Sequence, residues 1–132
     1  MKRMSEPMLI ALLSLLVGTM PICTDLYLPA LPTLKVDLGA SMSQAQLTLT
    51  GMLLAFGVSQ LFWGPLSDRW GRRPVLLLGL SAFTMAGAFC VIAPNIEQLI
   101  VWRTLQGAAM GSVVMCARAI VRDGYDPGDG AR

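Results

Sequence analysis

The stretch Gly-Pro-Leu-Ser-Asp-Arg-Trp-Gly-Arg-Arg-Pro, residues 64–74, joins two long runs that carry no charge. These runs, 47–66 and 74–93, contain no Asp, Glu, Lys or Arg. Each is long enough to cross a hydrocarbon layer of ~30 Å at a helix rise of ~1.5 Å per residue. Because the charged stretch between them needs water, the pattern predicts a membrane hairpin with its turn at one face of the bilayer.

The composition also indicates a membrane protein. Charged residues make up 14% of the 132 residues, against about 25% in soluble domains. The mean hydropathy is +0.62, and a soluble fold of this size has too little interior for so many apolar side chains. Histidine is absent, and Cys23, Cys90 and Cys116 lie far apart. This composition predicts no metal, cofactor or disulfide pattern and argues against an enzyme.

The apolar runs predict an all-α membrane protein with four transmembrane helices in one incomplete domain, residues 1–132. The helices are expected at about 8–29, 44–66, 74–93 and 96–118. The first run is longer than the 7–15 apolar residues of a signal peptide, so we interpret it as a span.

Two local patterns predict where the second and third helices begin. Ser41 and Ser43 are each followed three residues later by glutamine, which is the capping-box pattern. Pro74 suits the first turn of the third helix, where its missing N–H is not needed.

The basic residues predict the orientation of the four spans. One side holds Lys2, Arg3, Arg69, Arg72, Arg73, Arg118, Arg122 and Arg132. The other side holds Lys35. By the positive-inside rule both termini and the 67–73 loop are expected in the cytoplasm, and the 30–43 and 94–97 loops on the outside.

Asp25 and Arg103 are charges inside predicted spans, where a charge costs ~2.5–3.5 kcal/mol near the centre and usually has a function. Asp25 lies ~27 Å along the first helix and Arg103 ~10 Å from the outer end of the fourth, so they can share a level. We expect Asp25, Arg103 and Gln106 to line a cavity that couples protons to a substrate. Two alternatives stay open: Asp25 reaches only the outer headgroups, and Gln106 only joins helices.

Small residues at a spacing of four predict close helix packing. They are Gly51 and Ala55 on the second helix, and Gly107 and Gly111 on the fourth. Arg103 lies one turn from Gly107, so the charge and the packing stripe share a face.

These motifs resemble those of the major facilitator superfamily. Residues 64–74 are similar to the signature of its cytoplasmic loop between helices 2 and 3. Arg-Thr-Leu-Gln-Gly-Ala-Ala-Met-Gly, residues 103–111, resembles the helix 4 motif of its drug/proton antiporters, in which the arginine is implicated in proton transfer. Residues 24–32 and 118–123 are similar to the bicyclomycin and chloramphenicol resistance branch.

The resemblance implies proton-coupled multidrug efflux across the bacterial inner membrane, with a cytoplasmic N-terminus. It implies a latch at the cytoplasmic loop made by Gly64, Asp68, Arg69, Gly71, Arg72 and Arg73. The superfamily has two six-helix halves, so this chain is expected to be an N-terminal portion, inactive alone. Its expected partners are the lipid bilayer, a small amphipathic drug, protons and the missing C-terminal helices, with no nucleic acid.

Two other functions stay open at this point. One is a complete four-helix small multidrug pump that acts as a dimer. The other is a membrane subunit that does not transport. Neither explains the charged 64–74 stretch as well as the superfamily resemblance does.

Overall fold

The computed structural model describes residues 6–124, and these residues are almost entirely helical. Their elements are α1 (Glu6–Tyr27), the 3-10 turn η1 (Leu28–Ala30), α2 (Leu31–Asp37), α3 (Met42–Trp70), α4 (Arg72–Val91) and α5 (Ile96–Gly124). Four stretches are long and apolar enough to cross a membrane: Pro7–Asp37, Met42–Trp70, Arg72–Val91 and Ile96–Asp123. The prediction of an all-α protein with four membrane spans is confirmed.

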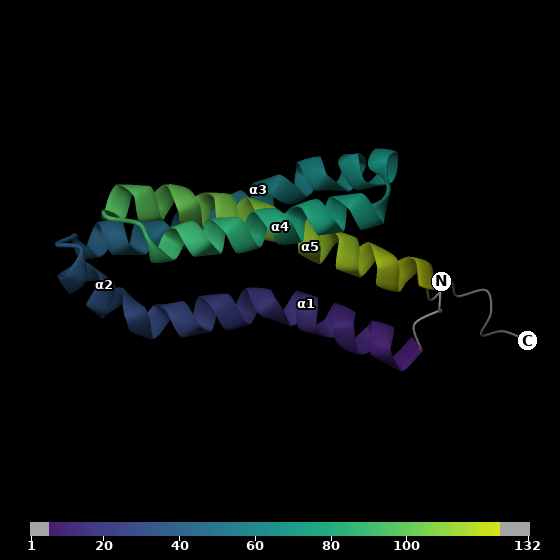
Figure 1. Cartoon of the computed structure of the whole chain (residues 1–132), viewed down its shortest axis with the longest axis horizontal. Coiled ribbons are helices and arrows are strands. Elements are labelled where there is room, and N and C mark those ends of the chain that lie inside the picture. Colours follow the sequence, from purple (N-terminus) through teal and green to yellow (C-terminus); the bar gives the residue numbers. More distant parts are fainter. Residues whose placement is uncertain (1–5, 125–132) are drawn as a thin grey trace, which may run out of the picture.

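Helix α5 is the centre of the bundle. Figure 1 shows α3, α4 and α5 grouped together, with α1 running along one side of the group. Helices α1, α3 and α4 all pack on α5, whereas α3 and α4 contact each other much less. In the apolar 18-residue window of the α5 span, 61% of the residues are buried. In the corresponding window of the span that contains α1, the buried share is 6%. Most of the other helix surface is therefore left for lipid.

Two apolar clusters hold the helices together. One lies where α4 and α5 meet the α2–α3 connection and is built on Ala40, Ile96 and Leu99. The other lies further along α5 and is built on Met110, Val113 and Val114, against which Leu16, Met20, Phe56, Leu76, Leu80 and Phe83 pack.

Small residues let α3 and α5 approach until their backbones nearly touch. A Cβ atom added at Gly107 would overlap the carbonyl group of Met52, and one added at Gly111 would overlap Ser59 Oγ. A Cβ at Gly51 would lie 2.7 Å from Thr104 Oγ1. Without a hydrophobic effect between helices in lipid, this close contact is what stabilises their packing. Ala55, one turn after Gly51, is partly buried.

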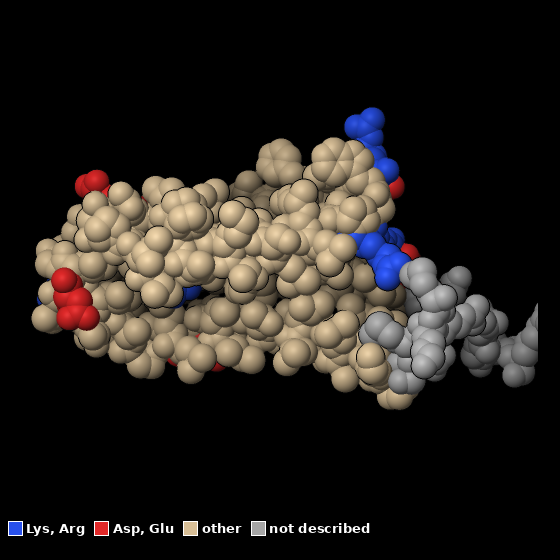
Figure 2. Space-filling view, viewed as in Figure 1, with Lys and Arg blue, Asp and Glu red and all other residues tan. Residues whose placement is uncertain are grey.

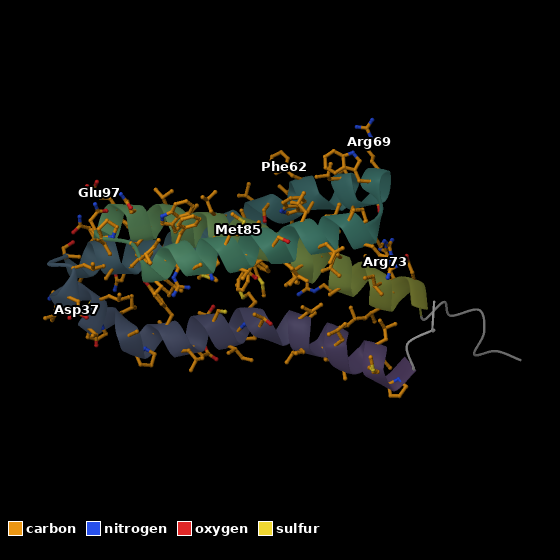
Figure 3. The ribbon with its side chains drawn as sticks, viewed as in Figure 1. Asp37, Phe62, Arg69, Arg73, Met85 and Glu97 are labelled. Atoms are coloured by element: carbon orange, nitrogen blue, oxygen red, sulfur yellow. The ribbon has the colours of Figure 1, made fainter. Side chains whose placement is uncertain are left out.

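Charged side chains gather at the two ends of the bundle. Figure 2 shows a broad band between them with few charged atoms. Figure 3 labels Asp37 and Glu97 at one end and Arg69 and Arg73 at the other. The start of α1, the α3–α4 junction and the end of α5 all lie at the basic end (Figure 1). Lys2, Arg3 and Arg132, which the topology prediction also used, lie outside the described residues.

The predicted turn at 64–74 is mostly helix. Helix α3 continues to Trp70 and α4 begins at Arg72, so the loop expected at 67–73 is reduced to Gly71. Helix α3 passes through Gly64 and Ser67, which are buried, and Ser67 Oγ donates to the Gly64 carbonyl at 2.8 Å. Gly71 has a φ of +90°, a conformation that favours glycine, so the chain can reverse within one residue.

The predicted 30–43 loop is also largely helical. The turn η1 and helix α2 occupy residues 28–37, each with proline in its first turn, where that residue favours a helix start. The capping box at Ser41 is confirmed: its Oγ accepts from Gln44 N at 3.1 Å, and Gln44 Oε1 accepts from Ser41 N at 3.0 Å. Ser43 lies inside α3 and starts no helix.

Helix α5 extends beyond the predicted end at residue 118, to Gly124. Arg72 explains part of this extension, because its Nη1 donates to the Ala119 carbonyl at 2.7 Å and pairs with Asp123. The last turns of α5 are therefore fixed to the first turn of α4.

Candidate functional site

Arg103 is a cation held inside the bundle, about two turns from the start of α5. Its side chain is partly buried. Nη1 donates to Gln106 Oε1 at 3.1 Å and lies 3.9 Å from the sulfur of Met52 on α3. The Nε atom is buried and has no hydrogen-bond partner among the described residues.

Tyr27, the last residue of α1, forms one wall of the Arg103 site. The guanidinium carbon of Arg103 lies 3.8 Å from the centroid of the tyrosine ring, which is cation–π geometry. The Tyr27 hydroxyl lies 2.5 Å from Thr48 Oγ1. Since Thr48 Oγ1 donates to the Ala45 carbonyl at 2.6 Å, the tyrosine is the donor to Thr48. Helices α1, α3 and α5 therefore meet at Arg103.

Gln106 is brought together with Arg103, as the sequence predicts for residues three apart on a helix. Its side chain is 7% exposed. Its Nε2 approaches α4 so closely that a Cβ atom at Gly87 would lie 3.2 Å away. Gln106 thus orients Arg103 on one side and contacts α4 on the other.

A pocket of about 240 Å³ opens beside these residues. Its lining residues are Tyr27, Leu34, Gly87, Cys90, Val91, Leu99, Arg103 and Gln106. We name it the Arg103 pocket. Figure 2 shows basic atoms set into a hollow between the two ends of the bundle. The pocket therefore combines mainly apolar walls with one cation and an amide.

Asp25 does not face this pocket. It is exposed, and no ion pair joins it to Arg103 among the described residues. Residues two apart on a helix point about 200° from each other, so the turn that directs Tyr27 toward α5 directs Asp25 away. Asp25 and Arg103 are therefore apart in the structure, although their similar depths in the membrane, estimated from the sequence, allow them to meet. The coupling role of Asp25 stays a prediction.

A second pocket, of about 440 Å³, lies between α3, α4 and α5 and is almost wholly apolar. Phe89 and Trp102 stack at one part of it, with ring centroids 4.4 Å apart. The indole N–H of Trp63 donates to the Ala108 carbonyl at 2.9 Å, so it is not available to a ligand. This pocket lacks the charge that distinguishes the Arg103 pocket.

The predicted latch residues lie at the basic end and have different environments. Gly64 is buried, and a Cβ there would lie 3.3 Å from Met115 Cε on α5. Asp68, Arg69 and Arg73 are exposed. Arg72 is instead engaged with α5 through Ala119 and Asp123.

Sequence reasoning missed two partners of the predicted residues, Tyr27 and Asp123, and also Thr48, the partner of Tyr27. Tyr27 lies within the 24–32 motif and could have been found as an aromatic residue at the depth of Arg103. Asp123 could have been found as an acid at the same end as Arg72. Thr48 has no signal of its own, because a threonine in a helix commonly bonds its own backbone, as Thr48 also does.

Three bacterial relatives match most of this chain. Multidrug resistance protein D of Escherichia coli is 38% identical over 126 residues, which are 96% of this chain and 32% of that protein. The uncharacterized MFS-type transporter YdgK of Bacillus subtilis is 42% identical over 85% of this chain and 28% of its own length. The chloramphenicol resistance protein of Pseudomonas aeruginosa is 43% identical over 76% of this chain and 24% of its own length.

These matches cover between 24% and 32% of the relatives' own lengths. No solved structure matches the chain. The family model described as Major Facilitator Superfamily matches residues 8–132. Since that match covers nearly the whole sequence, the chain belongs to the major facilitator superfamily, a family of transporters.

Proposed function

We propose that this chain is the N-terminal part of a proton-coupled multidrug exporter of the bacterial inner membrane. The observation that supports this most is Arg103, a cation kept inside a membrane span beside a pocket and held by Gln106 and Tyr27. A charge that is costly in lipid is retained there, which favours a functional role. Relatives named for multidrug and chloramphenicol resistance support export as its direction.

In this proposal Asp25 binds the proton and Arg103 controls its release. A nearby arginine favours the ionised carboxylate, whereas burial in lipid favours the protonated form. Because Asp25 is exposed on the side of α1 away from Arg103, coupling requires α1 to rotate or tilt during transport. The small buried share of the α1 span is compatible with such movement.

The proposal places both termini and the α3–α4 junction in the cytoplasm. The support is the excess of arginine at that end, under the positive-inside rule. Exposed Asp68, Arg69 and Arg73 are then available to latch the cytoplasmic face against further helices of the same transporter. A carboxylate at a helix N-terminus would be a favourable contact of this kind.

We also propose that transport needs helices beyond the four spans described. The relatives are at least three times as long as the matched region. Superfamily members bind substrate between two halves near the membrane midplane.

The first test is to sequence the DNA downstream of the codon for residue 132. A reading frame that continues into further apolar spans supports the proposal, and a stop codon at that point contradicts it.

The second test measures drug efflux by the full-length protein in a drug-sensitive bacterial strain. Efflux should require a proton gradient and stop when a protonophore collapses it. Arg103→Ala and Asp25→Asn should each abolish efflux while membrane insertion is unchanged. The matched controls are Lys35→Ala and Asp37→Asn, which remove exposed charges on α2 and should keep efflux. Normal efflux by both test variants would remove Arg103 and Asp25 from the mechanism.

A third test concerns the latch. Asp68→Asn should lower the turnover number of the full-length protein more than it raises KM, because a latch acts on the conformational cycle and not on substrate binding. Unchanged turnover would show that Asp68 is not part of a latch.

A further inference from the structure

We propose that the Arg103 pocket binds the anionic group of a small amphipathic molecule, with a carboxylate as the expected group. This inference deepens the proposed function. The identification of the bound molecule as the transported substrate rests on the proposed function. The binding site itself is argued from the charge, hydrogen bonding and shape of the pocket.

The charge of Arg103 is not balanced by any described neighbour. The ion pairs of the described residues involve Arg72 and Arg122, both at the basic end and both with Asp123. Asp25, Asp37 and Glu97 are exposed. A cation that is partly buried without a counter-ion is unfavourable in a medium of low dielectric constant, so an anion that enters the pocket meets a charge that no described acidic side chain neutralises.

The hydrogen-bonding groups of Arg103 are also incompletely used. The guanidinium has five N–H donors. Nη1 is bonded to Gln106 Oε1, while Nε is buried and has no partner among the described residues. The other contacts are the ring of Tyr27 and the sulfur of Met52, which attract a cation but accept hydrogen bonds weakly or not at all. A carboxylate would supply the missing acceptor and the missing charge together.

Two of the neighbouring polar atoms already have hydrogen-bond partners. The Tyr27 hydroxyl is engaged with Thr48, and Gln106 Oε1 is engaged with Arg103. The tyrosine ring lies against the guanidinium and limits the directions in which it can turn. The cation is therefore held in place before a ligand binds, which lowers the entropic cost of binding.

The remaining walls define the rest of the ligand. Leu34 from α2, Val91 from α4 and Leu99 from α5 line the pocket together with Arg103. A volume of about 240 Å³ fits a small ligand or one end of a larger drug. The matching molecule thus has a carboxylate at one end and an apolar body at the other.

The chain contains its own reporter for this pocket. Cys90 lines it, while Cys23 lies on α1 and Cys116 is buried in α5. In the full-length protein Cys90 is kept, and Cys23, Cys116 and any further cysteine are replaced by serine, so that Cys90 is the only thiol. Its rate of labelling is measured in detergent with two methanethiosulfonate reagents, one with a sulfonate and one with a trimethylammonium group. In each case the thiolate displaces methanesulfinate and forms a disulfide.

We expect Arg103 to favour the anionic reagent. Replacement of Arg103 by glutamine should lower the sulfonate-to-trimethylammonium rate ratio by about tenfold or more. Arg103→Lys should keep most of the preference, because it keeps the charge. A chain whose only thiol is Cys23 should show no comparable effect of Arg103→Gln. An unchanged ratio at Cys90 would overturn the proposal.

Ligand protection tests binding without altering Arg103. Benzoate should slow the labelling of Cys90, and Arg103→Lys should retain that protection. Benzamide, which has the same shape without the charge, should protect much less. Equal protection by the two compounds, or none by either, contradicts an anion site.

Vesicles distinguish a soluble anion from a lipid headgroup. Protection by benzoate in phosphatidylcholine vesicles assigns the site to a soluble carboxylate. Protection that arises from added phosphatidylglycerol, without benzoate, assigns the same anion site to a lipid phosphate. Labelling of Cys90 needs no transport. If benzoate protects Cys90 but the full-length protein shows no efflux, the anion site is supported and the proposed exporter function is contradicted.

Discussion

The guanidinium of Arg103 lies over the ring of Tyr27, with its carbon 3.8 Å from the ring centroid, and so links the end of α1 to the centre of the bundle. The ring also carries a hydroxyl that donates to Thr48 on α3. One aromatic side chain therefore joins three helices at the level of Arg103.

Removal of the Tyr27 ring should cost more stability than removal of its hydroxyl. Tyr27→Leu loses a cation–π contact of ~0.5–2 kcal/mol together with the hydrogen bond. Tyr27→Phe keeps the ring and loses a bond worth ~0.6 kcal/mol in membrane proteins. Thr48 keeps its own bond to the Ala45 carbonyl in both variants. Thermal unfolding of the chain in detergent measures the difference, and equal losses would mean that the ring contact contributes nothing.

Gly107→Ala should separate α3 from α5. The added methyl group would overlap the Met52 carbonyl, which belongs to the backbone and cannot rotate away. Overpacking of this kind typically costs ~1–3 kcal/mol. The control is Gly57→Ala on α3, where nothing lies within 4 Å of the added atom. Unfolding in detergent should show a clear loss for the first variant and no loss for the second; equal behaviour would contradict the close approach.

Gly71→Ala should strain the junction between α3 and α4. Its φ of +90° belongs to a region that other residues adopt only at a cost of ~1–3 kcal/mol. Space is not the problem, because the nearest atom to an added Cβ is 3.8 Å away. The same unfolding assay measures the effect. A variant as stable as the parent chain would show that the junction can adopt another conformation.

A double-mutant cycle on Arg72 and Asp123 should give a small coupling energy. The two side chains are 22% and 53% exposed, so water screens their attraction, and exposed pairs are worth ~0.2–1 kcal/mol. The coupling should decrease in molar salt. Arg72→Ala should cost more than Asp123→Ala, because it also removes the bond to the Ala119 carbonyl. A salt-independent coupling would argue that the pair is shielded from solvent.

The number and kind of the helices could be predicted because lipid imposes a simple rule. An apolar run of about twenty residues must satisfy its backbone internally and therefore forms a helix. The capping box at Ser41 is equally local, since both of its bonds lie within three residues. The helix end at Trp70 could not be predicted. The predicted helix ends at residue 66 because the charged residues Asp68 and Arg69 follow, whereas α3 continues through both of them.

The candidate site could be predicted in part. Arg103 and Gln106 were found because a charge in a span is conspicuous and residues three apart share a helix face. Their contact with Tyr27 depends on the rotation of α1 about its axis. Hydropathy gives no information on that rotation, because apolar residues occur on all sides of α1. The prediction that Asp25 and Arg103 can meet therefore rests only on their similar depth in the membrane.

The central place of α5 has a consequence for synthesis. The ribosome makes α1, α3 and α4 before α5, so these three enter the bilayer before the helix on which they pack exists. Two polar side chains of α3 can be accommodated in lipid before α5 is present, because Thr48 donates to the Ala45 carbonyl and Ser59 donates to the Phe56 carbonyl within the same helix. These two side chains of α3 are thus hydrogen-bonded within their own helix, and the contacts with α5 can form only after the last of the four described spans has been made.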